Sequence, residues 1–405
     1  MGTIKDKVAI IGMGCSKFGE RWDASPEDMI VEAVYEAYED AGVKPDDIEA
    51  AWLGTLRSWE SGSIVADALK LKNIPVTRVE NWCASGHESL RNAAFGVASG
   101  MYDIVLAVGF EKLKDTGFGG LGVGRGTNPV LQARATAPTY FSFIANRYFA
   151  HYGIPEDEGK KLLAQIAVKN HYNGSMSPKA HFQKPITIEQ VLKAPIIAWP
   201  LGLFDCCPTT DGAACAIICR ADIARKFRQD PIYVKGIGLS MDSMLPMVRP
   251  GFDYLGFDAN RMAARQAYEQ VGISTPRKEI DLASVHDCFT ITEMVIYEDF
   301  GFSKPGHAPD DIRAGTYTLE GELPVNTDGG LKAFGHPVGA SGLRTTYEIY
   351  KQLQGKAGPR QVKNAELGLA HTLGGPPQVA CVTILGNAAP TPTISSSVAT
   401  TGKRQ

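Results

Sequence analysis

Short apolar runs alternate with helical periodicities over the first hundred residues of the chain. Runs of strand length, rich in Val, Ile, Leu and Ala, predict strands at Lys7–Gly12, Ala50–Gly54, Val76–Glu80 and Asp103–Gly109. Apolar residues three and four positions apart predict helices at Pro26–Ala41, Ile64–Leu71 and Cys83–Ser99. This alternation predicts an α/β fold class, with a parallel or mixed sheet covered by helices on both faces.

The alternation stops near residue 117 and returns near residue 213. The segment Gly117–Leu203 is rich in glycine, aromatic and basic residues. Because a structureless loop of this length is unusual in a compact domain, we expect an inserted subdomain that shapes a binding site. Strand periodicity resumes at Ala213–Cys219, and a second α/β series begins at Tyr233.

Two short segments of the first half reappear in the second half in the same order. Ala37–Gly42 (Ala-Tyr-Glu-Asp-Ala-Gly) matches Ala267–Gly272 (Ala-Tyr-Glu-Gln-Val-Gly). Cys83–Gly86, which leads into a helix, has a counterpart in Val338–Gly342, which leads into a helix predicted at Leu343–Leu353. Their common order predicts a duplication into two similar α/β halves, with active-site groups where the helix N-termini of both halves converge.

Composition and charge place the chain among ordinary globular proteins. Its 405 residues are 44% hydrophobic and carry a formal net charge of −3, which excludes collagen-like and largely disordered classes and gives no reason to expect nucleic acid or an anionic membrane as the main partner. No stretch reaches the ~18 uninterrupted apolar residues of a membrane span, and no secretory leader precedes the first strand. The eight cysteines match neither a disulfide framework nor zinc-ribbon spacing. We therefore expect a soluble protein of the reducing cytoplasm.

Histidine, cysteine and glycine gather in four short segments at predicted turns and strand ends: Asn81–Gly86, His286–Phe289, Gly335–Gly342 and His371–Gly375. Cys83 opens a helix, where free N–H groups and the positive end of the dipole favour a thiolate. His336, held between a glycine and a proline, can accept the thiol proton, since an activated sulfur nucleophile usually pairs with a histidine from another segment. Cys288, close to His286, is either a second acid and base or a core thiol.

Two other interpretations of the sequence stay open. Cys83, His286, Cys288 and His336 are metal-ligand types, although their spacing matches no closed zinc site. The glycine-rich run Gly117–Gly126 fits a G-x-G-x-x-G pattern. It does not lie at a strand-to-helix turn and no clear helix follows it, so a flexible loop is favoured over a dinucleotide site.

With the four segments in this order, the chain resembles the thiolase superfamily, and specifically its sterol-carrier-protein-type and archaeal-like branch. Asn326–Gly330 (Asn-Thr-Asp-Gly-Gly) and Asp205–Pro208 (Asp-Cys-Cys-Pro) add to the resemblance, which extends to about Gly386. It implies the thiolase fold, with two βαβαβαββ halves in a five-layer αβαβα arrangement and an inserted loop subdomain. The expected boundaries are an N-terminal half at 1–117 and 204–230, a loop subdomain at 118–203, a C-terminal half at 231–387 and a disordered tail at 388–405.

The resemblance also implies a role for the candidate residues. Cys83 is the expected nucleophile, which carries the acyl group as a thioester, and His336 is its base and an oxyanion donor. His286 stands where many thiolases have an asparagine that holds a water near the thioester oxygen. The backbone N–H groups of Cys83 and Gly374 are expected to form the second oxyanion hole.

The second catalytic cysteine departs from the commonest thiolases. Aligned on Gly374, its usual position holds Thr372. In the sterol-carrier-type branch this cysteine comes from the His-Asp-Cys-Phe segment. The resemblance therefore implies that Cys288 transfers the proton at the α-carbon of the substrate.

The expected reaction is thiolytic cleavage of a 3-oxoacyl-CoA, or the reverse Claisen condensation, with CoA as co-substrate and no tightly bound cofactor or metal. We expect the degradative direction. Trp82, Tyr140, Phe141 and Phe143 allow a bulky or aromatic substrate such as benzoylsuccinyl-CoA, although each ring can instead pack the core. The alternatives are a ketosynthase-like condensing enzyme, an aldolase or lyase acting on side-chain CoA thioesters, and a non-catalytic lipid-binding subunit. The implied protein partners are a second copy in a homodimer and a separate OB-fold/zinc-ribbon (DUF35-type) subunit.

Overall fold

The structure, a computed structural model, describes residues 2–58, 60–116, 136–243, 249–375 and 377–390. In the first half, every strand and helix expected from the periodicity is present. The elements are β1 (Val8–Cys15), α1 (Pro26–Ala41), β2 (Ala50–Gly54), α2 (Ser63–Leu69), β3 (Val76–Val79), α3 (Ser85–Ala98), β4 (Ile104–Glu111) and β7 (Gly212–Arg220). All of β1 is buried, which explains why its sequence is a continuous apolar run without alternation.

Local side-chain chemistry accounts for the two ends of α1. The Ser25 hydroxyl accepts a hydrogen bond from the backbone N–H of Asp28, and the Asp28 carboxylate accepts one from the backbone N–H of Ser25, which forms a capping box. Gly42 ends the helix in the left-handed conformation, with a φ of 68°. In the second half, Gly272 ends α7 (Asp258–Val271) in the same way, with a φ of 91°. The repeat in the sequence is thus a repeat of helix ends.

The second half repeats the first, except that the counterpart of β3 is reduced to a single bridge in the part of the chain that the structure describes. Its elements are β8 (Ile232–Met241), α7, α8 (Pro276–Glu279), β9 (Leu282–Ser284), α9 (Thr290–Asp299), α10 (Ala308–Arg313), α11 (Gly330–Ala333), α12 (Ser341–Leu353), β10 (Leu367–Gly374) and β11 (Val379–Gly386). The hydrogen-bonded order β3-β2-β4-β7-β1 is matched by β9-β10-β11-β8. Where β3 would have its counterpart, the described residues contain only an isolated parallel bridge between Val325 and Ala283. The expected βαβαβαββ unit is complete in the first half and shortened in the second.

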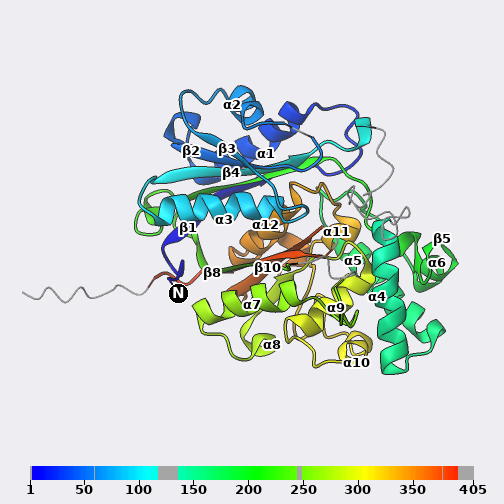
Figure 1. The fold of residues 1–405 in the computed structure, drawn as a ribbon. Helices are drawn as coiled ribbons and strands as arrows, with labels where there is room; N and C mark the ends of the chain where they lie inside the picture. Colours follow the sequence, from blue (N-terminus) through cyan, green and yellow to red (C-terminus); the bar gives the residue numbers. More distant parts are fainter. Residues whose placement is uncertain (1, 59, 117–135, 244–248, 376, 391–405) are drawn as a thin grey trace, which may run out of the picture.

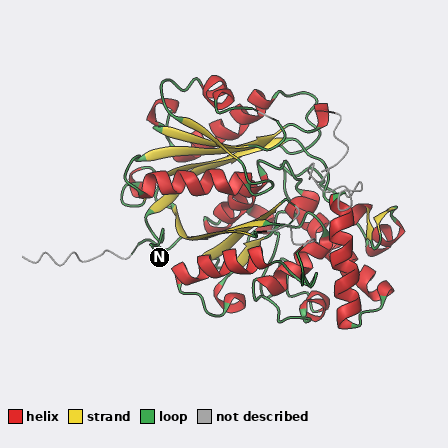
Figure 2. Ribbon diagram, viewed as in Figure 1, coloured by secondary structure: helices red, strands yellow, loops and turns green. Residues whose placement is uncertain are grey.

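The two half-sheets form separate layers with helices between and outside them (Figures 1 and 2). α1 and α2 cover the first half-sheet from outside, α3 and α12 lie between the half-sheets, and α7 covers the second half-sheet from outside. β1 and β8 are joined by only two residue pairs, so the nine strands splay into two halves instead of forming one flat sheet. The expected five-layer αβαβα fold is confirmed.

The two central helices meet at their N-termini. A Cβ at Gly86 would lie 2.7 Å from the carbonyl oxygen of Gly339, and a Cβ at Gly342 would overlap the backbone of α3. Only glycine permits backbones to approach this closely. The crossing brings the turn before α3, which carries Cys83, next to the turn before α12, which carries His336.

The inserted segment is largely helical where the structure describes it. It contains α4 (Ala137–Tyr152), α5 (Glu156–Ser175), α6 (Ile188–Lys193), β5 (Ile196–Ala198) and β6 (Leu201–Gly202). The sequence pattern predicts no clear helix after the glycine-rich run, and α4 and α5 correct this prediction. In α5 the pattern is obscured because polar Lys160 and Asn170 are buried and paired. Gly117–Gly126 and the tail from residue 391 lie outside the described residues, and the subdomain boundaries stay predictions.

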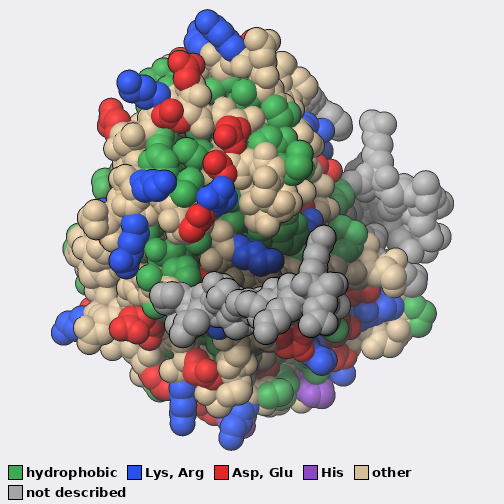
Figure 3. Space-filling view, turned by 90° about the vertical axis from the view of Figure 1, so that its left-hand side faces the viewer, with side chains coloured by type: hydrophobic (Ala, Val, Ile, Leu, Met, Phe, Trp, Pro, Cys, Tyr) green, Lys and Arg blue, Asp and Glu red, His purple; other side chains and the backbone are tan. Residues whose placement is uncertain are grey.

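The surface drawn in Figure 3 carries mixed charge. Lys and Arg side chains are interspersed with Asp and Glu among apolar and neutral groups on this face. Within the described part of the chain, no helix is long and apolar enough to cross a membrane. All eight cysteines are free thiols.

Candidate active site

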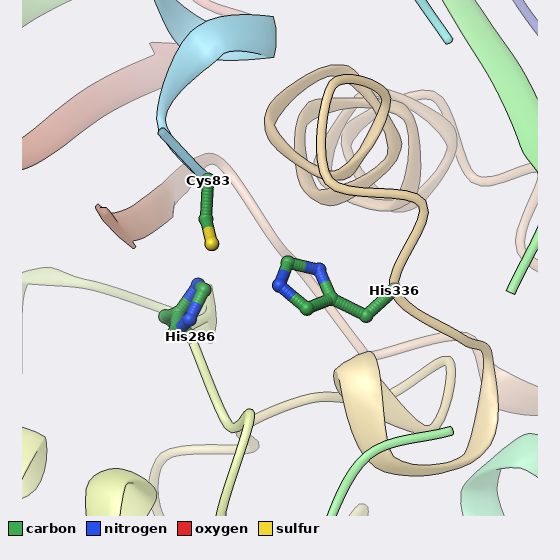
Figure 4. A group of neighbouring side chains, drawn as sticks. All are labelled: Cys83, His286 and His336. Carbon is green, nitrogen blue, oxygen red and sulfur yellow. The ribbon is translucent and has the colours of Figure 1, made fainter. Parts of the chain in front are cut away.

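Cys83 lies in the tight turn that leads from β3 into α3. The N–H of Ala84 donates to the carbonyl of Asn81 over 3.0 Å. The Ser85 hydroxyl accepts from the N–H of Asn81 at 3.0 Å and donates to the carbonyl of Trp82 at 2.5 Å. Cys83 itself is buried, and its Sγ points toward two histidine rings (Figure 4). The turn thus presents the thiol at the N-terminal end of a helix, as the sequence predicts.

His286 and His336 approach the sulfur of Cys83 from two other segments (Figure 4). One ligand-type atom of each of the three side chains lies within 4.8 Å of those of the other two. The two imidazole rings have centroids 5.2 Å apart and are nearly perpendicular, at 85°. The fold therefore brings together a thiol and two imidazoles that are far apart in the sequence.

The hydrogen bonds around His336 determine which ring nitrogen carries the proton. The Ser341 hydroxyl donates to the carbonyl of Pro337 over 2.8 Å. Because its only proton is used there, this hydroxyl can only accept from the Nδ1 of His336, 2.6 Å away. Nδ1 therefore carries the hydrogen. The unprotonated Nε2 is buried without a hydrogen-bond partner in the described part of the chain and faces the thiol, so it can take the proton of Cys83.

A chain of buried polar groups holds His286 in place. The Nδ2 of Asn260 donates to Asp299 over 3.0 Å, which turns its Oδ1 toward the Nε2 of His371, 3.1 Å away. His371 must then carry its hydrogen on Nε2, and its Nδ1 accepts the backbone N–H of His286 at 3.3 Å. The position of His286 is thus tied to β10 and α7.

Burial, more than the helix dipole, sets the protonation states of the site. Desolvation raises the pKa of Cys83 to about 12, although the backbone N–H of Gly375 opposes this shift. Desolvation, with the charge of Arg344, lowers the pKa of His336 to about 3. Burial also lowers the pKa of His286 well below its usual value. The resting site therefore holds a neutral thiol and neutral imidazoles, and the thiolate predicted from the helix N-terminus is not its resting form.

Four of the five predicted site residues share one cavity of about 230 Å³: Cys83, His286, Cys288 and His336. Much of the remaining wall is apolar. It includes Trp82, Leu113, Tyr140, Phe141, Ile197 and Phe289. An apolar wall disfavours water and strengthens electrostatic interactions with a bound substrate.

Gly374, the fifth predicted residue, is not among the described residues that line this cavity. A Cβ at this position would lie 2.6 Å from the carbonyl oxygen of Asn81 and 3.2 Å from the nitrogen of Ala84, so the end of β10 packs directly on the Cys83 turn. Its neighbour Gly375 does line the cavity, and its backbone N–H approaches the Cys83 sulfur. Sequence reasoning missed Gly375, although the Gly-Gly pair was an available signal.

Cys288 and Thr372 occupy different environments. The Cys288 thiol lies 3.7 Å from the Thr292 hydroxyl, and burial raises its pKa. Its carbonyl accepts the N–H of Cys207 at 2.9 Å, and Cys207 also lines the cavity. The Asp-Cys-Cys-Pro motif was the available signal for Cys207, but it was given no role at the site. Thr372 is buried in β10, where its hydroxyl bonds the Nδ1 of His87 at 2.7 Å. Cys288 thus lines the cavity, whereas Thr372 is not among its described lining residues and bonds His87 instead.

The three side chains around the sulfur also form a set of metal-ligand types. Cys83, His286 and His336 offer one sulfur and two nitrogens, a donor set that suits zinc. A metal bound there would occupy the lone pair of His336 that the thiol proton needs. Metal binding and proton transfer therefore exclude each other at this site.

Comparison with known proteins gives the same family for both halves of the chain. Residues 8–222 match the thiolase N-terminal domain, and residues 250–387 match the thiolase C-terminal domain-like family. An acetyl-CoA acetyltransferase of Methanothermobacter thermautotrophicus is 40% identical over 385 residues, which cover 93% of this chain and 98% of the relative. Sterol carrier protein 2 of Gallus gallus is 30% identical over 387 residues, which cover 91% of this chain and 70% of the relative.

A solved structure supports the same fold. The Ltp2-ChsH2(DUF35) aldolase superposes with a TM-score of 0.83 at 24% identity, and the match covers 96% of this chain and 100% of that chain. The domain matches span most of the sequence, and the relatives extend over nearly all of it. The chain therefore belongs to the thiolase family and is an acyl-CoA acyltransferase.

Proposed function

We propose that this enzyme cleaves a 3-oxoacyl-CoA with CoA, or runs the reverse Claisen condensation, and that Cys83 is its nucleophile. The observation that carries the proposal is the unprotonated Nε2 of His336 beside the Cys83 thiol at an apolar cavity. Because both groups are neutral at rest, the thiolate forms only as the substrate is attacked, and the empty site buries no isolated charge.

Each step of the cleavage has a residue of suitable chemistry. His336 takes the proton of Cys83, and the sulfur attacks the 3-oxo carbon. The C2–C3 bond then breaks, which leaves the acyl group on Cys83 and an enolate on the departing thioester. Cys288 protonates the α-carbon of this enolate and, as a thiolate, takes the proton of the incoming CoA thiol. CoA attacks the acyl-enzyme, and Cys83 leaves and regains its proton from His336.

Two groups of donors would stabilise the negative oxygens. Once protonated, His336 donates from Nε2 to the enolate oxygen, together with a water held near His286. The backbone N–H of Cys83 and that of Gly374 would serve the tetrahedral oxyanion on the acyl carbon. Gly375 is a further candidate for this second site, because its N–H already approaches the sulfur.

The wall of the cavity supports a bulky or aromatic acyl group, such as the benzoyl group of benzoylsuccinyl-CoA, in a degradative reaction. Trp82, Tyr140 and Phe141 line the cavity, and Phe141 stacks on Phe289 with ring centroids 4.6 Å apart. Phe143, the fourth ring singled out in the sequence, is half exposed and is not among the described residues of the wall. The relative from Methanothermobacter is named for acetyl transfer, so acetoacetyl-CoA is the smallest substrate to test.

Two alternative functions have support from the relatives. The solved structure with the TM-score of 0.83 is described as an aldolase, and the relative from Gallus gallus is named a sterol carrier. We favour acyl transfer over retro-aldol cleavage or lipid binding, because neither of these needs the thiol of Cys83 as a nucleophile.

The partners and location form part of the proposal. β3 is an edge strand that pairs only with β2 among the described strands, so a second copy of the chain can continue the sheet there. The aldolase structure contains a DUF35 component, which supports an OB-fold/zinc-ribbon subunit for this enzyme as well. The free thiols suit the reducing cytoplasm. The proposed reaction uses CoA as co-substrate and no tightly bound cofactor. The native mass of the complex tests both the homodimer and the added subunit.

A thiolysis assay with a panel of 3-oxoacyl-CoA thioesters, from acetoacetyl-CoA to benzoylsuccinyl-CoA, tests the reaction. We expect CoA-dependent cleavage of at least one substrate and a loss of about 10³-fold or more in Cys83→Ala. Cys219→Ala, which changes a buried thiol of β7, is the control and should stay active. Cleavage of a 3-hydroxyacyl-CoA to a carbonyl product and the shortened acyl-CoA, without CoA and unchanged in Cys83→Ala, would instead establish the aldolase. Full thiolysis by Cys288→Ala would remove its proton-transfer role.

A further inference from the structure

Asp287 stands between His286 and Cys288, and it is fully buried, yet no step of the proposed reaction uses it. We propose that Asp287 is a positioning residue, which fixes the turn that carries His286 and Cys288 against the segment that leads to His336. This inference rests on the proposed function, because Asp287 would set the distances from the side chains of His286, Cys288 and His336 to the sulfur of Cys83.

Donors from two separate segments bind the Asp287 carboxylate. The N–H of Leu331 donates to Oδ1 over 2.5 Å, and the N–H of Lys332 donates to Oδ2 over 3.2 Å. Both donors belong to α11, which runs directly into the turn of His336. From α5, the Nδ2 of Asn170 donates to Oδ2 over 2.8 Å. One carboxylate therefore joins the two histidine segments to each other and to the inserted subdomain.

The residues opposite Asp287 are shaped to receive it. Gly330 has a φ of 61°, and a Cβ there would overlap the Asp287 carboxylate. A second contact lies two residues upstream, where the Oδ1 of Asn326 accepts the N–H of Val285 at 2.8 Å. Asn326 thus binds the backbone of Val285, and Gly330 leaves the space that the Asp287 carboxylate fills. The Asn-Thr-Asp-Gly-Gly motif, which had no role in the proposed reaction, has a physical function in this arrangement.

The contacts suit an ionised carboxylate. All the hydrogen bonds described above are donated to it, so it acts as an acceptor on both oxygens. Burial and the nearby Glu293 raise the pKa of Asp287, while the α11 N–H groups and Arg344 oppose this shift. Asn170 links the two acids, because its Nδ2 also donates to Glu293 over 2.6 Å. In Asp287→Asn, an amide NH₂ replaces one acceptor oxygen and meets donors.

Steady-state kinetics of Asp287→Asn test the inference. We expect kcat to fall by about 10- to 100-fold with little change in KM, because the catalytic groups are displaced while the rest of the substrate site is retained. The rate at which iodoacetamide alkylates Cys83 should fall as well, since this rate depends on the nearby base. Asp40→Asn is the control: it alters a part-buried carboxylate of α1 that accepts the N–H of Met13 and the hydroxyl of Tyr350 and should lower only stability.

A milder variant keeps the test decisive if Asp287→Asn fails to fold. Asn170→Ala removes one donor and leaves both α11 bonds, so a smaller fall in kcat is expected. A folded Asp287→Asn or Asn170→Ala enzyme with wild-type kcat and alkylation rate would overturn the inference. If the wild-type enzyme cleaves none of the 3-oxoacyl-CoA substrates, the proposed function fails. The alkylation rates then still decide whether Asp287 positions the base beside Cys83.

Discussion

The hydroxyl group of Ser341 donates its only proton to Pro337 and therefore accepts the Nδ1–H of His336. A single hydroxyl thus selects the tautomer whose lone pair faces Cys83. Because desolvation lowers the pKa of His336 to about 3, the ring is a neutral acceptor at physiological pH. The orientation of the base depends on a residue that belongs to the helix and not to the reacting group.

We predict that Ser341→Ala lowers kcat about tenfold or more. The substitution leaves a buried Nδ1–H without a partner, at a cost of about 1–3 kcal/mol, which allows the other tautomer to compete. Thiolysis kinetics with CoA measure the effect. Ser89→Ala is the matched control, because the Ser89 hydroxyl of α3 donates to the carbonyl of Gly86 in the same manner without bonding a histidine. Equal kcat in both variants would show that Ser341 does not select the tautomer.

At the scale of elements, the crossing of α3 and α12 sets the relation between nucleophile and base. Gly86 and Gly342 are the contact points, and neither position has room for a Cβ. Because the obstructing atoms are backbone, no side-chain rotation relieves the overlap. Any separation of the helices also separates the turns that carry Cys83 and His336.

Gly86→Ala should therefore reduce both stability and activity. We expect a loss of about 1–3 kcal/mol in the free energy of unfolding and a fall in kcat beyond what the lost folded fraction explains. Denaturant unfolding and thiolysis measured on the same sample separate the two effects. Gly96→Ala in α3 is the control, since its Cβ would meet the ring of Trp52, which can move. Normal kcat in a folded Gly86→Ala enzyme would refute the role of the crossing.

Elements with local signals could be predicted from the sequence, and those without them could not. The bounds of α1 were predictable to the residue because Ser25 and Gly42 mark its ends by their own chemistry. α5 was missed because its buried face includes Lys160 and Asn170, whose partners lie elsewhere in the chain. The loss of the strand next to β9 could not be predicted either, because only one tertiary bridge, between Ala283 and Val325, remains there among the described residues.

The candidate site shows the same division. Cys83, His286, Cys288 and His336 were found from the residue types of short segments, and they share a cavity in the structure. The approach of Gly375 to the sulfur and the neutral state of the thiol both depend on packing and burial, which no short segment encodes. Residue type thus indicated which groups could react, and the fold determined the protonation state of these groups.

At the scale of the whole molecule, buried neutral histidines couple stability to pH. Desolvation lowers the pKa of His87 and that of His336 to about 3, and the pKa values of His286 and His371 lie well below the usual value. In the unfolded chain each histidine binds a proton near its ordinary pKa of 6.5. Above pH 6.5 these histidines are neutral in both the folded and the unfolded state. As the pH falls below 6.5, only the unfolded chain binds protons, so the free energy of unfolding decreases.

We predict that the free energy of unfolding decreases by about 1.4 kcal/mol per pH unit for each such histidine as the pH falls from 6 toward 5. Denaturant titrations across this range measure the slope. His87→Gln should make the slope shallower, because it removes one of the contributing groups. A stability that stays constant between pH 7 and pH 5 would contradict the burial of neutral histidines.

The central claim is that Cys83 carries the acyl group. Mixing the enzyme with a cleavable 3-oxoacyl-CoA in the absence of CoA, quenching in acid and measuring peptide masses tests it most directly. The account predicts one acyl group on the peptide that contains Cys83, released on addition of CoA and absent in Cys83→Ala. Turnover of the substrate with no acyl group on Cys83, or with the acyl group on another cysteine, would contradict it.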